Sequence, residues 1–478
     1  MIRAVIFWFG VLCVGFTALQ YITQILWATL SGRLLRDHRS GSRPLALAKI
    51  TSDDAVPGVT MILPAYNEEA VITHTAVSAL AQEYPKLEVI IVNDGSKDNT
   101  LQVLIDRFDM EPFDDDPQQG VIPTCDLFTI YRSRSEHRIV VVDKAGSGAK
   151  ADNVNVGINL ASHPWVVVMD GDEFLEPDSI GRCMAEVLVE PGEIAAIGGT
   201  LLPSNSIVID GPNIVERHAP TNYWVGCQLI EYLTAFLLAR PGLARIGAMP
   251  FVSGGFGMYR RDSVVAAGGY KHGHLGEDMD MCLSVQRTLA DTDMGNAVIQ
   301  VPESVCWTEF PSTKDVLRRQ RIRWHRGLKM ALDDHGSMFG RRRYGRVGTV
   351  GIGSLYVLEW LGPLLEATGW VIMAMMLAIG WISPLGAMFI FLFTQFLGMA
   401  MTMLAVAMMT THLRVFNGFK DTLRMMVWAI ALNWGYRQLT LVWRIRSLFP
   451  GEAGWGEMPR SGFKTESSAG GNLETVNA

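Results

Sequence analysis

The sequence predicts an α/β domain with a mainly parallel sheet, flanked on both sides by helices that enter a membrane. In the middle of the chain, apolar strand-like runs alternate with helix-like stretches, which is typical of βαβ units. Long apolar segments lie near both ends. Hydrophobic residues make up 49% of the 478 residues and charged residues only 19%, a balance that excludes a disordered chain and is rich for a soluble enzyme. We expect a membrane helix over 1–32, the α/β domain over 55–330, membrane or interfacial helices over 345–447, and a disordered tail over 465–478.

Charge and cysteine content exclude several classes of protein. The formal net charge of −7 argues against a nucleic-acid partner, because binding phosphates needs a clustered basic excess. Six cysteines are scattered without a C-x-x-C pair, so we expect neither a structural zinc site nor a disulfide framework. A reducing compartment fits this pattern best.

The first apolar segment is long enough to cross a bilayer. Ala4 to Leu30 carries no charged residue, and about 1.5 Å of rise per helical residue covers a hydrocarbon core of roughly 30 Å. One arginine precedes it and four follow it: Arg3, then Arg33, Arg36, Arg39 and Arg43. The positive-inside rule then places the N-terminus outside and the following domain in the cytoplasm. This flank favours an uncleaved helix, with a signal sequence as the alternative.

A second apolar block runs from Val347 to about Met409 and is interrupted at Pro363 and Ser383–Pro384. Two long spans or three short ones fit it. Glu359 and Glu366 lie inside the block, and carboxylates within a membrane usually face a bundle interior or a polar cavity. The alternative is that the part before Pro363 lies at the interface, with Glu359 in water.

A last apolar run, Met425 to Trp443, carries Asn433 and Arg437. It fits either a membrane span or an amphipathic interfacial helix.

The middle region is expected to form a sheet whose strand ends carry the ligand site. The expected strands are Val59–Leu63, Leu87–Val92, Ile139–Val142 and Trp165–Met169, and the expected helices are Glu68–Gln82, Lys150–Leu160 and Met279–Arg287. The acidic, proline-containing stretch Asp109–Gln119 looks like a surface insertion. Ligands of such sheets gather at the carboxyl ends of the strands.

Three polar turns follow these strands. They are Pro64–Glu68, Asn93–Ser96 and Asp170–Asp172. Their common position at one rim of a parallel sheet describes a ligand crevice. Taken singly, Asn67 also fits a helix cap and Asp94–Gly95 an ordinary turn.

Asp170 and Asp172 form the sharpest motif. They follow a wholly apolar strand and are separated by Gly171, so both carboxylates can face a hard divalent cation while the glycine admits close approach. The all-oxygen donor set suits Mg²⁺ or Mn²⁺, which would neutralise a departing diphosphate. A plain acidic turn is the alternative.

Two helix starts offer further chemistry. Lys144–Asn153 does not match G-x-x-x-x-G-K-[ST], but its small residues open a helix at which Lys150 can meet an anion. A solvated lysine is the simpler alternative. Glu277–Asp278 opens the next helix, where a carboxylate can act as a general base on a hydroxyl or can merely complement the helix dipole.

A basic helix precedes the second membrane block. Gln320, Arg323 and Trp324 stand at i, i+3 and i+4, hence on one helix face. This face combines a guanidinium for phosphate oxygens with an aromatic plane for stacking on a sugar. A basic juxtamembrane helix with an interfacial tryptophan is the alternative.

In this order, the motifs resemble those of the processive family 2 glycosyltransferases, which include cellulose, hyaluronan, chitin-oligosaccharide and poly-N-acetylglucosamine synthases. The matching residues are Asn93–Ser96 with Asp94, Lys150–Asn155, Asp170–Asp172, Gly276–Asp278 and Gln320–Trp324 as Q-x-x-R-W; Gly435–Gln438 and Trp455–Met458 match more weakly. The resemblance runs from about Val59 to Gly327 and extends to the flanking membrane helices.

The resemblance implies a Rossmann-like GT-A fold and an inverting transfer from a UDP-sugar to a growing β-linked polysaccharide. Asp94, Lys150, Asp170, Gln320 and Arg323 would bind the nucleotide sugar. Asp170 and Asp172 would hold the divalent cation, Mg²⁺ or Mn²⁺, and Asp278 would be the catalytic base. Trp324 and Gly254, the latter in Ser253–Gly255, would contact the acceptor glycan.

Two departures limit what the resemblance implies. Gly276 stands where many members carry Thr or Ser, which leaves the surroundings of the base in doubt, and the acidic run Asp114–Asp116 has no assigned role.

The resemblance also implies a multi-pass protein of the bacterial inner membrane with a cytoplasmic catalytic domain, in contact with membrane lipids and possible accessory export subunits. Glu359 and Glu366 could then line a polar path for the product. A single-sugar transferase acting on a lipid or polyprenyl phosphate and a non-catalytic membrane scaffold are the alternatives. The sugar itself is not readable, because a few hydrogen bonds discriminate one sugar from another.

Overall fold

The computed structural model describes residues 2–40, 43–50, 56–113, 120–125, 127–190, 192–290, 292, 294–416, 418–451 and 462–465. The acidic run Asp114–Asp116, the segment Trp455–Met458 and the predicted tail beyond Thr465 lie outside these residues. The chain divides into two compact units. The sheet unit comprises Arg36–Pro220, Met249–Phe310 and Glu457–Ala478, and the helical unit comprises Met1–Leu35, Thr221–Ala248 and Pro311–Gly456.

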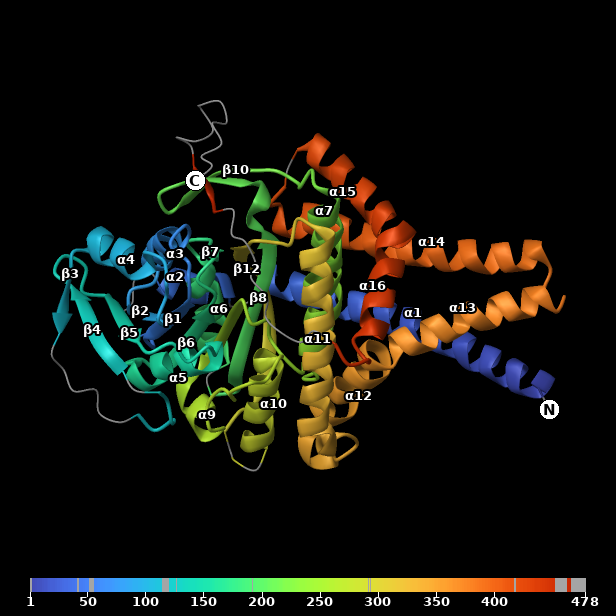
Figure 1. The fold of residues 1–478 in the computed structure, drawn as a ribbon, viewed down its shortest axis with the longest axis horizontal. Helices are drawn as coiled ribbons and strands as arrows, with labels where there is room; N and C mark the ends of the chain where they lie inside the picture. The colour runs from blue at the N-terminus through green and yellow to red at the C-terminus, as the bar shows by residue number, and fades with distance from the viewer. Residues whose placement is uncertain are drawn as a thin grey trace. The chain divides into compact units, whose positions relative to one another are not determined.

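The sheet unit contains a ten-stranded sheet in the order β3-β4-β5-β2-β1-β6-β11-β8-β12-β7 (Figure 1). Its strands are β1 (Val59–Ala65), β2 (Leu87–Asn93), β3 (Met110–Phe113), β4 (Leu127–Ser133), β5 (Ile139–Lys144), β6 (Trp165–Met169), β7 (Phe174–Leu175), β8 (Ile194–Pro203), β11 (Phe256–Arg260) and β12 (Ala297–Thr308). The strands β5, β2, β1 and β6 are parallel, and β8 is parallel to β12. This arrangement brings the carboxyl ends of four neighbouring strands to one rim.

The sheet is mixed, so the expectation of a mainly parallel sheet is wrong. β11 lies between β6 and β8 and is antiparallel to both, and β4 is antiparallel to β5. The segment Thr221–Ala248, which precedes β11 in sequence, belongs to the helical unit. The direction in which a strand runs is not registered by its apolar run, so the sequence pattern does not show that β11 is antiparallel.

Helices cover the sheet along its length. They are α2 (Arg43–Ile50), α3 (Ile72–Leu80), α4 (Thr100–Phe108), α5 (Lys150–Leu160), α6 (Ser179–Val189), α9 (Arg261–Ala266) and α10 (Glu277–Leu289). β1 and β6 are buried along their whole length, as strands enclosed on both faces require. The helix α5 packs on β1 and β2, and Gly157 permits this approach because a Cβ there would lie 2.3 Å from Ile62 Cγ2.

Outside the main sheet, the sheet unit has a second sheet of three strands in the order β10-β9-β13. Its strands are β9 (Ile207–Asp210), β10 (Asn213–Arg217) and β13 (Lys464–Thr465). Thr465, the first residue of the predicted tail, thus belongs to a strand that pairs in parallel with β9.

The helical unit consists of long helices, several of them broken by π turns. Its elements include α1 (Ile2–Ser40), α7 (Tyr223–Leu233), η2 (Thr234–Ala239), α8 (Arg240–Arg245), α11 (Lys314–His335), η5 (Val347–Gly351), α12 (Ile352–Ser354), η6 (Leu355–Trp360), α13 (Gly362–Ala378), α14 (Pro384–Met408), η7 (Met409–Leu413), α15 (Phe419–Ala431), η8 (Leu432–Tyr436) and α16 (Arg437–Arg446). Ile6 and Cys13 of α1 pack against Ile372 of α13. These packed helices carry the apolar segments identified in the sequence.

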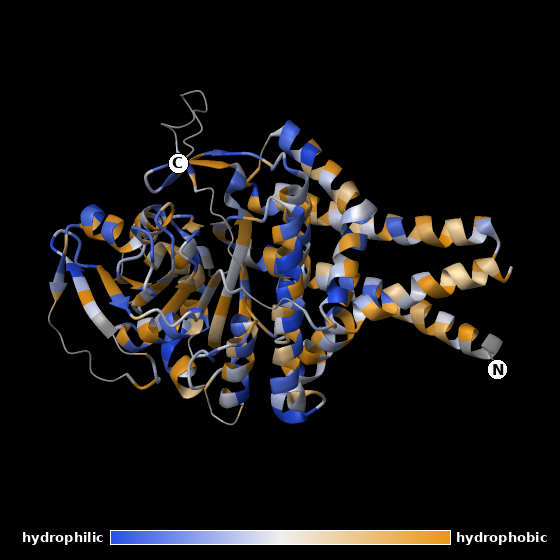
Figure 2. Ribbon diagram, viewed as in Figure 1, coloured by the Kyte–Doolittle hydropathy of each residue, from blue (hydrophilic) through white to orange (hydrophobic). Residues whose placement is uncertain are grey.

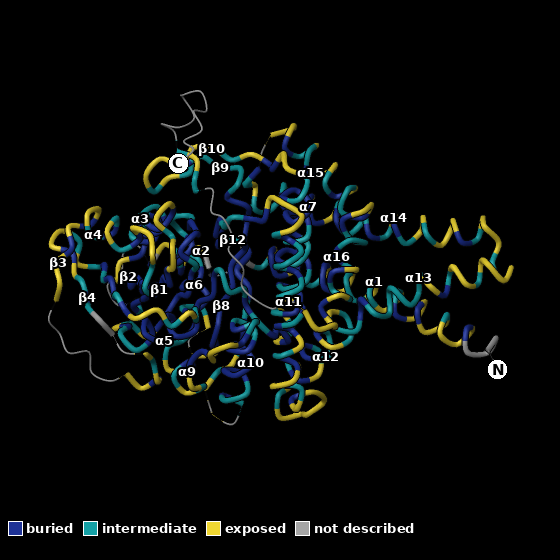
Figure 3. Tube along the Cα trace, viewed as in Figure 1, coloured by how far each residue is buried: buried dark blue, intermediate teal, exposed yellow. Residues whose placement is uncertain are grey.

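Among the described residues, two helices are long and apolar enough to cross a membrane, Ile6–Asp37 and Pro384–Leu413. A pair bent by 41°, Val347–Trp360 with Gly362–Ala378, provides a third if it forms one span. Apolar residues dominate α1, α13 and α14 in Figure 2. Figure 3 shows much of these helices exposed, in contrast to the buried strands of the sheet. Exposed apolar side chains such as Trp8 and Phe389 are those that a lipid phase would cover.

The two glutamates of the apolar block are both paired in the structure. Glu366 Oε2 lies 3.1 Å from Arg437 NH2, and Glu359 Oε2 lies 2.7 Å from Arg444 NH2. Glu359 is more than half exposed. Ion pairing lowers the cost of placing these charges near lipid.

Candidate active site

The rim formed by β1, β2, β5 and β6 carries the predicted polar turns. Asn93 ends β2 and Lys144 ends β5, while Asp170 directly follows β6. The Asn93 amide donates to Asp143 at 2.7 Å, and Asn67 adopts a left-handed φ of 55° after β1. All three turns therefore belong to the same edge of the sheet, as the sequence predicts.

Asp94 organises the loop that follows β5. Its carboxylate accepts hydrogen bonds from Lys144 Nζ at 2.7 Å and from the backbone N–H groups of Ser147 and Gly148 at 2.8 and 3.1 Å. Burial alone would raise the pKa of Asp94, but the hydrogen bonds from Lys144 and Ser147 outweigh it and hold that pKa below its ordinary value. Asp94 is thus an ionised acceptor that fixes the loop before α5.

Lys144 is fully buried between two carboxylates. Its ammonium contacts Asp94 on one side and Asp152 on the other at 2.8 Å, and it donates to Asn153 at 3.1 Å. Burial would lower the pKa of Lys144, but the two aspartates raise it above the ordinary value. Reasoning from the sequence missed this lysine. The pattern that could have indicated it is a lysine at the end of an apolar strand.

Lys150 stands at the first turn of α5 and connects the turn after β6 to the loop before β11. Its Nζ pairs with Asp170 and donates to the Gly254 carbonyl at 3.3 Å. Glu277 Oε1 lies 4.0 Å away. Burial would lower the pKa of Lys150, and the surrounding carboxylates of Asp170 and Glu277 raise it. The side chain keeps 17% of its surface exposed, so its charge can reach an anionic ligand.

The turn after β6 carries three acidic residues, Asp170, Asp172 and Glu173, with Gly171 between the first two. Asp170 is partly exposed, whereas Asp172 and Glu173 are buried. Glu173 Oε2 accepts the Asp170 N–H at 3.1 Å. Burial, together with the charges of Asp170 and Asp172, raises the pKa of Glu173 well above its ordinary value. Asp170 and Asp172 thus offer carboxylate oxygens, the donor type that a hard divalent cation takes.

Asp278 lies at the start of α10, beside Gly254. The Gly254 N–H donates to Asp278 Oδ2 at 2.9 Å, and the Met279 N–H donates to Oδ1 at 2.8 Å. A carboxylate has about four acceptor positions, so capacity remains for a substrate hydroxyl. The structure therefore brings together Lys150, Asp170, Gly254 and Asp278.

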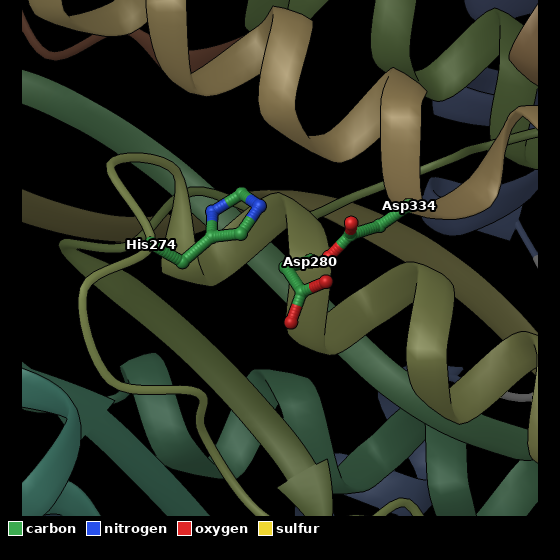
Figure 4. Close-up of side chains that lie close together, drawn as sticks. All are labelled: His274, Asp280 and Asp334. Carbon is green, nitrogen blue, oxygen red and sulfur yellow. The ribbon is translucent and has the colours of Figure 1, made fainter.

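The loop around Gly276 has its own polar contacts. The His274 Nδ1 atom accepts the Gly276 N–H at 3.1 Å. His274 and Asp280 have ligand atoms within 4.8 Å of each other (Figure 4), and Asp280 pairs with Lys271 at 2.8 Å. Asp334, also drawn in Figure 4, belongs to the helical unit. These contacts stabilise the loop that leads into Asp278.

The Q-x-x-R-W residues lie on α11, in the helical unit. Gln320 and Arg323 are partly buried, and Trp324 is 38% exposed. The Arg321 guanidinium lies 4.4 Å from the centroid of the Trp324 ring. Trp324 therefore presents an aromatic surface while a neighbouring cation holds its ring.

Two family models match the chain. The model for glycosyl transferase family 2 matches residues 60–266, and the model for glycosyl transferase family group 2 matches residues 165–416, more than half of the chain. The chain belongs to glycosyl transferase family group 2. This membership confirms the resemblance expected from the motifs, and the two models together span every predicted site residue.

Two relatives of this group 2 chain are synthases of the same name. The chain is 26% identical over 292 residues to the poly-beta-1,6-N-acetyl-D-glucosamine synthase of Staphylococcus aureus strain COL, covering 61% of this chain and 60% of that protein. It is 25% identical over 272 residues to the synthase of the same name from Staphylococcus epidermidis, covering 57% and 55%. The chain thus spans about 60% of the length of the curated relatives it matches.

A solved structure shares the fold of this group 2 chain. It is a mannosyltransferase from Pyrobaculum calidifontis in complex with GDP-Man and Mn²⁺, with a TM-score of 0.52 and 16% identity over 90% of this chain and 99% of that one. At this identity the likeness concerns the fold alone. Together with the mixed sheet and the family models, it identifies the GT-A fold.

Proposed function

We propose that the chain transfers a sugar from a UDP-sugar to the end of a growing β-linked glycan, with inversion at the anomeric carbon. The observation that carries this proposal is the linked set Lys150, Asp170, Gly254 and Asp278. It places a cation and an acidic turn, both suited to a diphosphate, beside a carboxylate suited to a base. The relatives' name makes N-acetylglucosamine the first sugar to test.

In the proposed reaction, Asp278 takes the proton of the acceptor hydroxyl. The hydroxyl oxygen attacks the anomeric carbon, and the bond from that carbon to the diphosphate oxygen breaks with its electron pair leaving on the diphosphate. The Lys150 ammonium stabilises the negative charge that develops there. Attack on the face opposite the leaving group converts an α-linked donor into a β-linked product. Hydrogen bonds from Gly254 and Met279 hold the base in place.

The remaining predicted residues have supporting roles in this proposal. Asp170 and Asp172 would hold Mg²⁺ or Mn²⁺, which supplies charge neutralisation for the diphosphate when bound. Asp94 shapes the loop at which the nucleotide base would bind. Gln320 and Arg323 would contact the diphosphate, and the exposed ring of Trp324 would stack on the acceptor sugar.

The proposed setting is the bacterial inner membrane, with several spans and the sheet unit in the cytoplasm. The candidate spans and the arginines after the first of them support this orientation. Contact with membrane lipids and export through the chain's own helices, with or without accessory subunits, belong to the same proposal. Glu359 and Glu366 remain candidates for lining that path, now as members of ion pairs with Arg444 and Arg437.

A donor panel tests the proposal. The full chain in detergent or membranes is incubated with Mg²⁺ or Mn²⁺ and labelled UDP-GlcNAc, UDP-glucose, UDP-glucuronate or GDP-Man, and the products are sized. We expect a polymer from one UDP-sugar, lost in Asp278→Asn and retained in Asp262→Asn, whose side chain is 59% exposed. Label that enters only a lipid fraction as one sugar would replace the proposal with the lipid-linked alternative. Absence of transfer from every donor would contradict both.

A further inference from the structure

A polar triad within the helical unit connects α7, α11 and the end of η8. Arg321 NH2 lies 2.7 Å from Glu231 Oε2 and 3.3 Å from the Tyr436 hydroxyl, and that hydroxyl donates to the same Glu231 oxygen at 2.9 Å. Arg321 is 7% exposed and Tyr436 1% exposed. Every pair in the triad is therefore in direct contact, with Arg321 and Tyr436 buried and the Glu231 side chain 39% exposed.

The chain bends sharply to place Tyr436 in this triad. Trp434 and Gly435 have non-helical backbone angles, and Gly435 has a φ of +114°, a conformation that favours glycine. A regular helix through these residues would point the phenol elsewhere. The Tyr436 ring packs with Cys227, Leu317 and Trp443, so the bend and the apolar cluster fix the hydroxyl against Arg321. The motif Gly435–Gln438, weakly matched in the sequence, thus has a physical role.

The triad contacts Trp324 through Arg321. The guanidinium lies over the indole at 4.4 Å, a cation–π contact. Tyr232, next to Glu231 in sequence, lies 6.4 Å from the same ring between centroids. Trp324 is thus contacted by groups from α7 and α11, while 38% of the residue remains exposed. A ring held by neighbouring groups and still partly exposed is suited to stacking on a sugar.

We propose that Glu231, Arg321 and Tyr436 are positioning residues that set the place of Trp324, and through it the place of the acceptor sugar. This inference rests on the proposed function. Glu231 neutralises the charge of Arg321. Arg321 therefore has a positioning role, whereas contact with the diphosphate is given to Arg323, two residues later. The triad thus acts on the acceptor, whereas donor binding is given to other residues, among them Lys150, Asp170 and Arg323.

The test measures acceptor and donor affinities separately. Variants Glu231→Gln and Tyr436→Phe of the full chain are assayed in detergent with UDP-sugar and a short β-linked oligosaccharide of the same sugar. We expect the acceptor KM to rise about tenfold or more, because a small misplacement of a reacting group is costly, while the donor KM changes less than twofold. More of the donor is then hydrolysed than transferred. Lys329→Gln, which removes an exposed ion pair with Asp333 on the same helix, is the matched control and leaves both values unchanged.

A double-mutant comparison separates positioning from general loss of structure. In a Trp324→Ala background, Glu231→Gln should have no further effect on the acceptor KM. Equal effects with and without Trp324, or a fall in kcat with unchanged acceptor KM, would overturn the proposal.

A measurement without turnover separates this proposal from the proposed function. The protein is labelled with 5-fluorotryptophan, and the ¹⁹F resonance missing in Trp324→Phe is assigned to Trp324. We expect that resonance to move in Glu231→Gln and Tyr436→Phe but not in Lys329→Gln. A shifted resonance in an enzyme that transfers no sugar would support the positioning role while the proposed function fails; an unshifted resonance would overturn the positioning role.

Discussion

Lys144 and Lys150 lie six residues apart and have different surroundings. Lys144 has no exposed side-chain surface and is held by Asp94 and Asp152. Lys150 keeps part of its surface exposed and contacts Asp170 at the rim. A buried ion pair is costly to break, because the remaining partner keeps an uncompensated charge. We therefore propose that Lys144 maintains the architecture of the site and that Lys150 contacts the ligand.

Replacing Lys144 should destabilise the sheet unit and weaken nucleotide binding. Lys144→Met leaves Asp94 and Asp152 facing each other without their cation, and we expect a loss of about 3–5 kcal/mol in the free energy of unfolding. Thermal unfolding and calorimetric titration with UDP measure the two effects. Lys86→Met, at an exposed position, is the control. A variant with unchanged stability and unchanged UDP affinity would contradict this role.

Gly255 is expected to be intolerant of a side chain. A Cβ there would lie 2.1 Å from Glu173 Oε1, and Glu173 is buried and hydrogen-bonded to the Asp170 N–H. Gly255→Ala must therefore displace the buried Glu173 carboxylate, which holds the Asp170 N–H, and we expect at least a tenfold loss of kcat. Gly336→Ala is the control, because no atom lies within 4 Å of the corresponding Cβ. Full activity in Gly255→Ala would show that Glu173 moves freely.

At the scale of residues, the sequence indicates motif members but not their partners. Asp170, Asp172 and Asp278 are recognisable because each follows a strand or opens a helix. The pairing of Lys144 with Asp94 spans fifty residues and depends on β2 lying beside β5. Local patterns contain no information about such a contact.

At the scale of elements, α11 anchors the segment that follows α16. His325 Nδ1 lies 2.7 Å from Ser447 Oγ, and Arg326 donates to the carbonyls of Ser447, Phe449 and Gly451 at 2.9–3.2 Å. These bonds satisfy carbonyl groups that the end of a helix leaves without partners. The same helix that carries Trp324 therefore holds the chain beyond α16.

His325 should make stability depend on pH. Burial lowers its pKa to about 4, Arg444 acts in the same direction and Glu359 opposes it. An unfolded histidine titrates near 6.5, so between about pH 6.5 and 4 the unfolded chain binds the extra proton. The stabilisation of the folded chain by neutral His325 is complete above this window and is lost as the pH falls through it.

Thermal unfolding in detergent from pH 7.5 to 4.5 measures this effect. The wild type should lose more stability on acidification than His325→Gln, whereas His218→Gln, at a side chain 61% exposed, should behave like the wild type. Parallel curves for wild type and His325→Gln would contradict the assignment.

Element boundaries show where sequence patterns succeed and where they fail. The predicted helix Lys150–Leu160 and strand Trp165–Met169 are confirmed to the residue. The helix predicted from Glu68 begins at Ile72, because the Glu68 carbonyl accepts from Val71 and Ile72 in a turn after the left-handed Asn67. The apolar run to Trp443 is broken at Gly435. Apolar periodicity does not register such local backbone geometry.

At the scale of the whole molecule, the apolar segments and the family motifs occupy different units for the most part. The sequence indicates the α/β class and the flanking helices, and both are confirmed. It does not indicate that Thr221–Ala248 belongs to the helical unit. Nor does it indicate that β11 is antiparallel to β6 and β8.

Membrane orientation can be tested with the native cysteines. Cys125, in the sheet unit, is exposed, and the other five cysteines are buried. Burial and the neighbouring Asp152 raise the pKa of the Cys125 thiol, so labelling is run at mildly alkaline pH. We expect a membrane-impermeant maleimide to label inverted vesicles and not intact cells with an opened outer envelope, with no labelling of Cys125→Ser. Labelling from the outside would contradict a cytoplasmic sheet unit.

The configuration of the new glycosidic bond tests the central claim most directly. Product made by the purified chain from the α-linked UDP-sugar it accepts is examined by proton NMR, and the anomeric coupling constant is read. Direct displacement with Asp278 as base predicts β linkages alone. Linkages of the α configuration would contradict a single displacement, and with it the role given to Asp278.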